Sequence, residues 1–329
     1  MAKSTTFQTK QNVSVRVITE ASMGTTPTDT AYTTMPVTDF SFSERYGHSL
    51  GVAPPRTGVG GMAQSDDMVK WEHHNKMFDI SITFHATAQA IDRVCLALFG
   101  DGTTPNALLG SMPSVTNYTH GASNIVPVSL SFEGAAHDGG TTDMYFTSCL
   151  CTGLTFTGDI ASNGGVVMCT ATFQTGYEPT EAALTLSGSE TAISAQATMF
   201  NVHELQTTTL DGEDILLYNF DVAISRPVNR ISFDPDNDYR PMGYSVGQYE
   251  VTGNLTCKRD GEVDDAINNS AAMALDLDTT VFQITGDKVY LDNSGISFDD
   301  DGWKQTIPLR FTYDSAATSN AVITIGTAA

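Results

Sequence analysis

The sequence predicts a mainly β protein made of two tandem β-sandwich or β-barrel domains, each with a short flanking α-helix. Thr, Ser, Gly and Ala fill much of the chain, a composition that suits short strands and turns. Several short segments alternate apolar and polar residues. A pattern of strand, loop, strand, helix and paired strands occurs twice, across residues 40–173 and 231–312.

Strands are expected at residues 11–20 and 35–43, and the second of them contains Phe40-Ser41-Phe42, where the first copy begins. After a long Gly-rich loop, the segment Phe78–Phe84 places an apolar residue at every second position, which predicts a strand with one buried face. Strands are also expected at Ser148–Thr157 and Val166–Phe173.

A helix is expected directly after Phe78–Phe84. Thr87 is a suitable N-cap, and Gly100 is suited to end the helix. The apolar residues between them follow helical spacing and are Ile91, Val94, Cys95, Leu98 and Phe99.

The second copy repeats this order with less regular residues. Ile231-Ser232-Phe233 corresponds in this interpretation to Phe40-Ser41-Phe42, and Tyr249–Thr256 to the alternating strand. Asp260 takes the capping position. Two further strands are expected at Lys288–Phe298 and Gln305–Thr312. The expected domains are therefore residues 1–180, a linker at 181–212, and residues 213–329 with a C-terminal arm.

Charge limits the function classes. The chain has 38 acidic and 16 basic residues, a net charge of -22. Stable DNA binding requires clustered Lys and Arg, so such binding is not expected. There is no apolar stretch of about 18 residues and no apolar N-terminal segment, so we expect neither a membrane span nor a signal peptide.

The five cysteines do not suggest a disulfide framework. Their number is odd and their spacing irregular, so we expect buried free thiols in a reducing cytosol. Cys149 and Cys151, two apart in an expected strand, should share one face.

We expect no catalytic residues, metal site or cofactor. Residues 234–238 space their acids as a calcium loop does, but Tyr239 and Ser245 replace the required Gly and carboxylate. Residues 299–302 are best interpreted as a hairpin turn. Adjacent His73 and His74 seldom bind one zinc ion.

The order of motifs resembles that of tail tube proteins of long-tailed, siphovirus-like bacteriophages. The resemblance begins with the acidic residue and Gly-Thr-x-Pro turn of Glu20–Thr28. It continues through Phe40–Glu44, the strand Phe78–Phe84 and the helix end Leu96–Gly100, and then through Gly164–Phe173. It covers most of residues 11–178 and, more weakly, 213–314.

The resemblance implies a non-enzymatic structural subunit of the virion tail, made in the host cytoplasm. Sheets of neighbouring subunits would join into a ring, and stacked rings would form a hollow tube for DNA. The tube would also contact a tape-measure protein and tail-end proteins, and DNA would pass through without specific binding. A duplicated chain would form a trimeric, pseudo-hexameric ring; the alternative is a hexamer whose second half is a decoration domain.

Two loops, 44–76 and 234–248, are expected to contact the next ring. The candidate residues in them are Tyr46, His48, Leu50, Pro54, Arg56, Trp71, Asp236, Asp238, Tyr239, Arg240 and Tyr244. Alternative functions are capsid decoration, a baseplate protein, a carbohydrate-binding β-sandwich module and an unrecognised enzyme.

Overall fold

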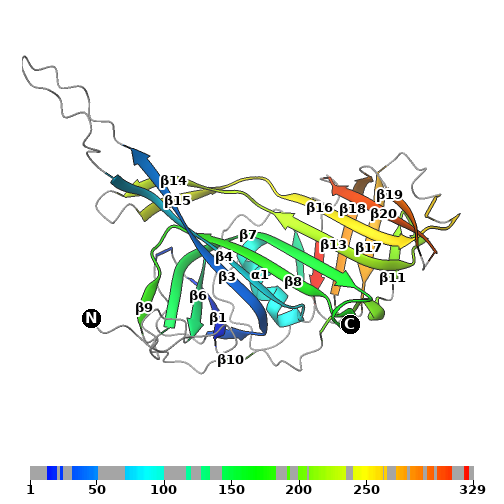
Figure 1. Cartoon of the computed structure of the whole chain (residues 1–329), viewed down its shortest axis with the longest axis horizontal. Coiled ribbons are helices and arrows are strands. Elements are labelled where there is room, and N and C mark those ends of the chain that lie inside the picture. The colour runs from blue at the N-terminus through cyan, green and yellow to red at the C-terminus, as the bar shows by residue number, and fades with distance from the viewer. Residues whose placement is uncertain are drawn as a thin grey trace, which may run out of the picture.

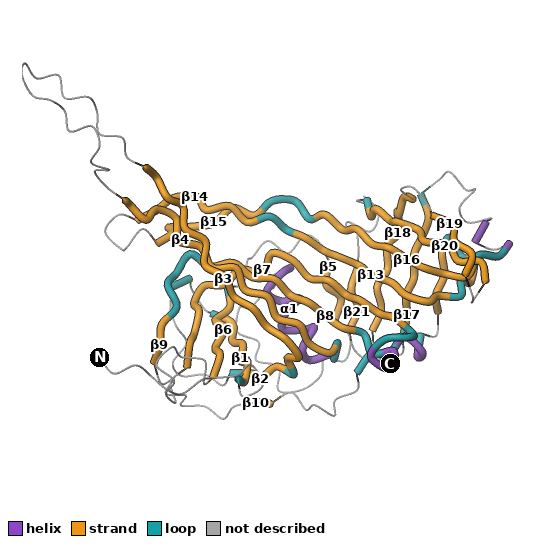
Figure 2. Tube along the Cα trace, viewed as in Figure 1, coloured by secondary structure: helices purple, strands orange, loops and turns teal. Residues whose placement is uncertain are grey.

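The computed structural model describes the chain in segments separated by gaps. The described residues are 13–20, 23–24, 32–50, 71–99, 116–119, 127–133, 143–182, 191–192, 199–205, 207–234, 240–261, 263–264, 272–279, 282–291, 295–299, 302–312 and 322–325. Strands dominate them, as the alternating sequence predicts (Figure 2).

In its described residues, the first half contains ten strands and the helix α1, Ala88–Phe99. The strands are β1 (Ser14–Thr19), β2 (Thr33–Met35), β3 (Val37–Leu50), β4 (Trp71–His85), β5 (Thr116–Thr119), β6 (Val128–Glu133), β7 (Asp143–Asp159), β8 (Met168–Thr175), β9 (Thr180–Ala182) and β10 (Thr191–Ala192).

The second half contains the remaining described strands. They are β11 (Thr207–Leu210), β12 (Glu213–Asp214), β13 (Leu217–Ser225), β14 (Val228–Asp234), β15 (Arg240–Val246), β16 (Glu250–Lys258), β17 (Met273–Asp278), β18 (Phe282–Leu291), β19 (Gly295–Asp299), β20 (Gly302–Phe311) and β21 (Val322–Ile325). Two short 3₁₀ turns lie at Asn163–Gly165 and Val202–Glu204.

One antiparallel sheet runs through both halves in the order β3-β4-β8-β7-β13-β16-β20-β19. The halves meet where β7 pairs with β13, side by side in Figure 1. They also meet where β5 of the first half pairs with β21 of the second. The strand β7 also belongs to a second layer, because its N-terminal part pairs with β6 and β9. From β6 this layer continues through β1 and β2 to β10.

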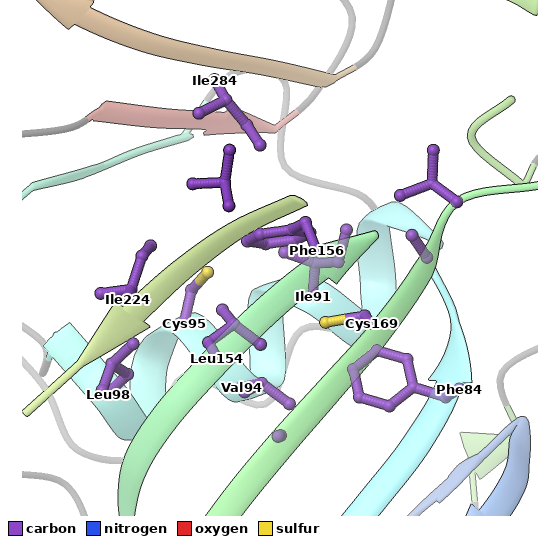
Figure 3. Close-up of a cluster of buried hydrophobic side chains, with 14 of the residues drawn as sticks. Phe84, Ile91, Val94, Cys95, Leu98, Leu154, Phe156, Cys169, Ile224 and Ile284 are labelled. Atoms are coloured by element: carbon purple, nitrogen blue, oxygen red, sulfur yellow. The ribbon is translucent and has the colours of Figure 1, made fainter. Parts of the chain in front are cut away.

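The helix α1 packs on β7 and fills the core. Ile91, Val94, Cys95 and Leu98 are buried and lie near Leu154 and Phe156 of β7 (Figure 3). Side chains of the second half, among them Ile224 and Ile284, join the same hydrophobic cluster. The two halves therefore share one continuous core.

Both ends of α1 are capped by side chains. The Thr87 hydroxyl accepts a hydrogen bond from the Ala90 amide at 3.3 Å, as expected of an N-cap. At the other end, Arg226 and Tyr249 of the second half donate to the Leu98 carbonyl at 2.9 and 2.7 Å. A cation at a helix C-terminus is favourable because of the helix dipole.

The order of strand pairing in the first half recurs in the second. In the first half β1 pairs with β2 and β6, β6 with β7, and β7 with β8 and β9. In the second half β11 pairs with β12 and β17, and β17 with β18. The strands β18 and β19 both pair with β20, and β18 also pairs with β21.

The pairing register of β3 with β4 matches that of β13 with β16. A register shift lies between Val37 and Asp39 of β3, and another lies between Leu217 and Asn219 of β13. Ile82 faces Phe40 on β3 and Ala171 on β8.

Leu255 occupies the corresponding place in the second half, facing Phe220 on β13 and Ile307 on β20. Phe220 therefore has the place of Phe40. The sequence pattern had matched Phe40 to Ile231 instead, but Ile231 lies on β14.

Local sequence patterns located many of the elements. The expected strand at 11–20 contains β1, and Phe78–Phe84 lies within β4. The second helix is described only at Gly261 and residues 263–264, where the Val263 amide donates to the Asp260 carboxylate at 3.2 Å. The range 181–212 contains β10, the second 3₁₀ turn and β11.

Replacing Val94 by Asp tests the packing of α1. Val94 is buried, so the variant should lose roughly 3–5 kcal/mol of unfolding free energy because an unpaired carboxylate enters the core. Denaturant unfolding measures this loss. Gln89→Asp is the control, since Gln89 is only half-buried and an acid in the first helical turn is favourable. Equal stability of the two variants would contradict the packing.

Candidate assembly surfaces

Two long hairpins extend beyond the main sheet toward the same end of the molecule (Figure 1). The first, termed arm 1, is formed by the distal parts of β3 and β4, which pair as far as Leu50 opposite Trp71. The second, arm 2, is the β14–β15 hairpin that continues β13 and β16. The regions expected to be long loops thus lie in paired strands at the described residues 44–50 and 71–76, and at 234 and 240–246.

Several of the candidate ring-contact residues lie on these arms. Tyr46, His48 and Leu50 lie on β3, and Trp71 lies on β4. Arg240 lies on β15, opposite Asp234. The others fall outside the described residues and are Pro54, Arg56, Asp236, Asp238 and Tyr239.

Tyr244 has a defined role within the chain. It lies on β15, its side chain is buried, and its hydroxyl accepts a hydrogen bond from the Gly176 amide at 3.3 Å. Gly176 directly follows β8 of the first half. The base of arm 2 therefore packs on the first half of the chain.

The face of the main sheet opposite the core is covered by small polar side chains. Hydroxyl pairs join neighbouring strands at Thr83–Thr170, Thr152–Thr172 and Thr256–Thr306, with separations of 3.0, 3.1 and 3.4 Å. Side-chain amides bond to carboxylates in the same way at Gln174–Asp79 and Asn254–Asp221, at 2.9 and 2.8 Å. Such cross-strand pairs stabilise a solvated face without apolar contact.

Acidic side chains outnumber basic ones on this polar face. Among the described side chains of the eight strands, the carboxylates that share it are Asp39, Asp79, Asp159, Asp221 and Glu250. The cations are Lys258, Lys304 and Arg310. The face is thus weakly negative and lacks the clustered cations that hold nucleic acid.

Four of the six large apolar side chains that are exposed in the described part of the chain lie on the two outer strands of the sheet or directly beside them. Phe42 on β3 is 40% exposed, while Ile296 and Phe298 on β19 are 51% and 68% exposed. Trp303, beside Phe298 on β20, is 55% exposed, and its ring centroid lies 4.9 Å from that of Phe298. Clustered exposed apolar residues usually mark a contact surface.

A comparison with protein families identifies the chain. The model of a family described as phage tail tube protein matches residues 10–321. The chain belongs to this family. A search of curated proteins found no match. The tail tube protein is therefore a structural component of a phage tail, as the order of its motifs indicated.

A buried acid lies beside Gly24 of the tail tube protein. Glu20 is fully buried and accepts hydrogen bonds from the Ser129 hydroxyl at 2.5 Å and from the Ser148 amide and hydroxyl at 2.6 and 2.9 Å. The Ser148 hydroxyl in turn accepts from the Gly24 amide. Ser148 has a φ of 51°, a left-handed conformation rare for a non-glycine residue.

Burial dominates the electrostatics of Glu20. Desolvation raises the pKa of its carboxyl above 4.5, although the hydrogen bonds from Ser129 and Ser148 oppose this shift. Sequence reasoning identified Glu20 only as part of a motif. Its burial depends on Ser129 and Ser148, more than 100 residues away, and no local signal indicates that contact.

All five cysteines are free and buried, as expected, and burial raises the pKa values of their thiols. Within the described residues, no three His, Cys, Asp or Glu side chains gather to hold a metal. None of the described helices is long and apolar enough to span a membrane.

The raised pKa of Glu20 predicts a pH-dependent stability. The folded protein retains the Glu20 proton to higher pH than the unfolded chain, so this contribution is complete below pH 4.5 and is lost as pH rises through the raised value. Glu20→Gln should remove that loss. Relative to the wild type, the variant should therefore gain stability progressively as pH rises from 4.5 toward neutral and above.

Denaturant unfolding across this pH range measures the difference. The control is Glu250→Gln, because Glu250 is exposed on the polar face. A constant difference between the wild type and Glu20→Gln over the range would contradict the assignment.

Proposed function

We propose that the tail tube protein is an internally duplicated tube subunit, and that three copies form a pseudo-hexameric ring. Rings stack into a hollow tube that conducts DNA from capsid to host cell. The observation that carries this proposal is the recurrence of one pairing order on both sides of the β7–β13 junction.

The two proposed units are residues 1–180 and 213–329. The recurrent pairing order of the second unit starts before residue 213, because it includes β11. Each unit contributes four positions to the main sheet: β3, β4, β8 and β7, then β13, β16, β20 and β19. The pairing of β7 with β13 is then a contact between two neighbouring units of the ring, formed inside a single chain. A ring of six units needs three such chains, and closed rotational symmetry leaves no open sheet edge.

A hexamer with the second half as decoration is less well supported. A decoration domain would be joined by a linker and would leave the tube sheet of the first half complete by itself. In this chain β13 extends that sheet directly, and Arg226 and Tyr249 cap the helix of the first half.

The polar face of the main sheet is the proposed wall of the DNA channel. The helix α1 and the other layer cover the opposite face, so a ring with that face inward would fill its own centre. The polar face has more carboxylates than cations, and a negative wall repels phosphates. That repulsion lets the duplex pass without binding, although salt screens it beyond about 10 Å at 0.1 M.

The two arms are the proposed contacts between stacked rings. Both leave the same end of the main sheet, as contacts along a tube axis require (Figure 1). Further partners of such a tube are a tape-measure protein inside it and the tail-end proteins. The protein would be made in the host cytoplasm and act in the virion.

Negative-stain microscopy of the purified protein tests this function, since stacked hollow rings are expected. Arm 2 offers a specific variant. Asn229 faces Ser245, so a two-residue Asn-Gly turn can replace the residues between them while keeping the register. The variant should fold and form rings that no longer stack.

Tyr244→Phe is the matched control for this replacement. It removes the hydrogen bond to Gly176, worth about 1 kcal/mol, but keeps the arm. It should form normal tubes. Normal tubes from the shortened variant would show that arm 2 makes no contact needed for stacking.

A further inference from the structure

The internal junction supplies a template for the contact between two copies. In it, β7 and β13 pair antiparallel, with Thr157 opposite Asp221 and Phe156 opposite Val222. Phe156 and Val222 are buried in the shared core. In the order of the main sheet, the template therefore pairs the final strand of one unit, β7, with the initial strand of the next, β13.

The strand β19 has the place of the C-terminal part of β7. Ala171 of β8 faces Ile82, and Ile307 of β20 faces Leu255, the residue that corresponds to Ile82. The residues directly before them, Thr170 and Thr306, therefore also correspond to each other. Thr170 faces Thr155 of β7, and Thr306 faces Gly295 of β19.

Counting along both strands, Ile296 corresponds to Phe156 and Ser297 to Thr157. The β18–β20 pairing agrees, since Leu291 faces Leu309 as Cys151 faces Phe173.

The strand β3 has the place of β13 by the same reasoning. Phe40 corresponds to Phe220, so Ser41 corresponds to Asp221 and Phe42 to Val222. Within the described residues, β3 is paired only with β4, and β19 only with β20. Both strands thus lie at edges of the main sheet.

Side chains on these edges are exposed although their counterparts in the template are buried. Phe156 is 0% exposed and Val167 is 2% exposed, while Ile296 and Trp303 at the corresponding places are more than half exposed. In the template, Phe156 is covered by the second unit, including Phe282 at a ring-centroid distance of 5.2 Å. In the second unit, a neighbouring chain is needed to provide such cover.

We propose that β19 of one copy pairs antiparallel with β3 of the next, with Ser297 opposite Ser41 and Ile296 opposite Phe42. This rests on the proposed function, because it specifies how the rings close. Pairing joins two open strand edges, which otherwise favour uncontrolled association. It also covers Phe42, Ile296, Phe298 and Trp303 with apolar surface.

Cysteine cross-linking tests the register. Ser41 and Ser297 are both exposed on the polar face, so replacing them disturbs no core contact. The double variant Ser41→Cys, Ser297→Cys should form a disulfide between copies on mild oxidation, giving dimers and trimers on a non-reducing gel. The five native cysteines are buried and should not react.

The control shifts the pair by one repeat of the strand. In Ser43→Cys, Ser297→Cys, the two residues become diagonal neighbours, with Cβ atoms farther apart than the roughly 3.5–4.5 Å that a disulfide requires. This variant should cross-link weakly, and each single variant should give at most a dimer through like residues. Stronger cross-linking of the diagonal pair would overturn the register.

Electron microscopy of the same samples separates this inference from the proposed function. Cross-linked trimers that do not stack would support the β19–β3 contact and refute the tube. Stacked rings without the in-register disulfide would refute the contact and leave the tube standing. Monomers without cross-links would refute both.

A second variant tests the apolar part of the contact. Ile296→Asp changes a side chain that is exposed in the single chain, so the protein should fold but remain monomeric in light scattering. Leu216→Asp is the matched control, because Leu216 is 60% exposed but lies on neither outer strand. It should form rings. Ring formation by Ile296→Asp would overturn the proposal.

Discussion

Every strand in this protein depends on the pairing of backbone amides and carbonyls along its edges. The strand β7 meets that requirement on both sides over most of its length, with β6 and β13 on one edge and β8 and β9 on the other. It therefore connects the two layers of the first half and joins that half to the second. A polar backbone group left unpaired in this position would be buried at high cost.

The same junction brings side chains of both halves into one core. Ile224 and Ile284 enter the core around α1, and Arg226 and Tyr249 bind the carbonyl at its end. The guanidinium of Arg226 also lies 4.6 Å from the ring centroid of Tyr249, which adds a cation–π contact. Without the second half, the end of α1 would lose both of these donors, and part of the first core would face water.

The sequence predicted elements whose signals are local. The alternation of Phe78–Phe84 and the N-cap at Thr87 depend on neighbouring residues only, and both are found. The arms were expected to be loops because glycines and prolines follow their strands, yet β3 extends to Leu50. Phe40 was matched to Ile231 because their local patterns agree, whereas the pairing registers match it to Phe220.

Contacts between distant residues were beyond local reasoning. The Glu20 carboxylate meets Ser129 and Ser148 only after the two layers have packed. The exposure of Ile296 and Phe298 likewise depends on β19 being an outer strand. An alternating apolar segment looks the same in sequence whether its partner strand belongs to the same chain or to another.

In the proposed ring, covalent connection of two tube units would change the kinetics of assembly. Half of the contacts between units would form within a chain, at a high effective concentration, and would require no collision between molecules. The two kinds of contact are also encoded by different residues, so they can diverge independently. Gly158 in the internal contact leaves room for the Phe220 ring, while the corresponding residue of the second unit is Phe298. The contact inside the chain can thus be permanent. The contact between chains can stay reversible, so that a misplaced subunit can dissociate while the tube grows.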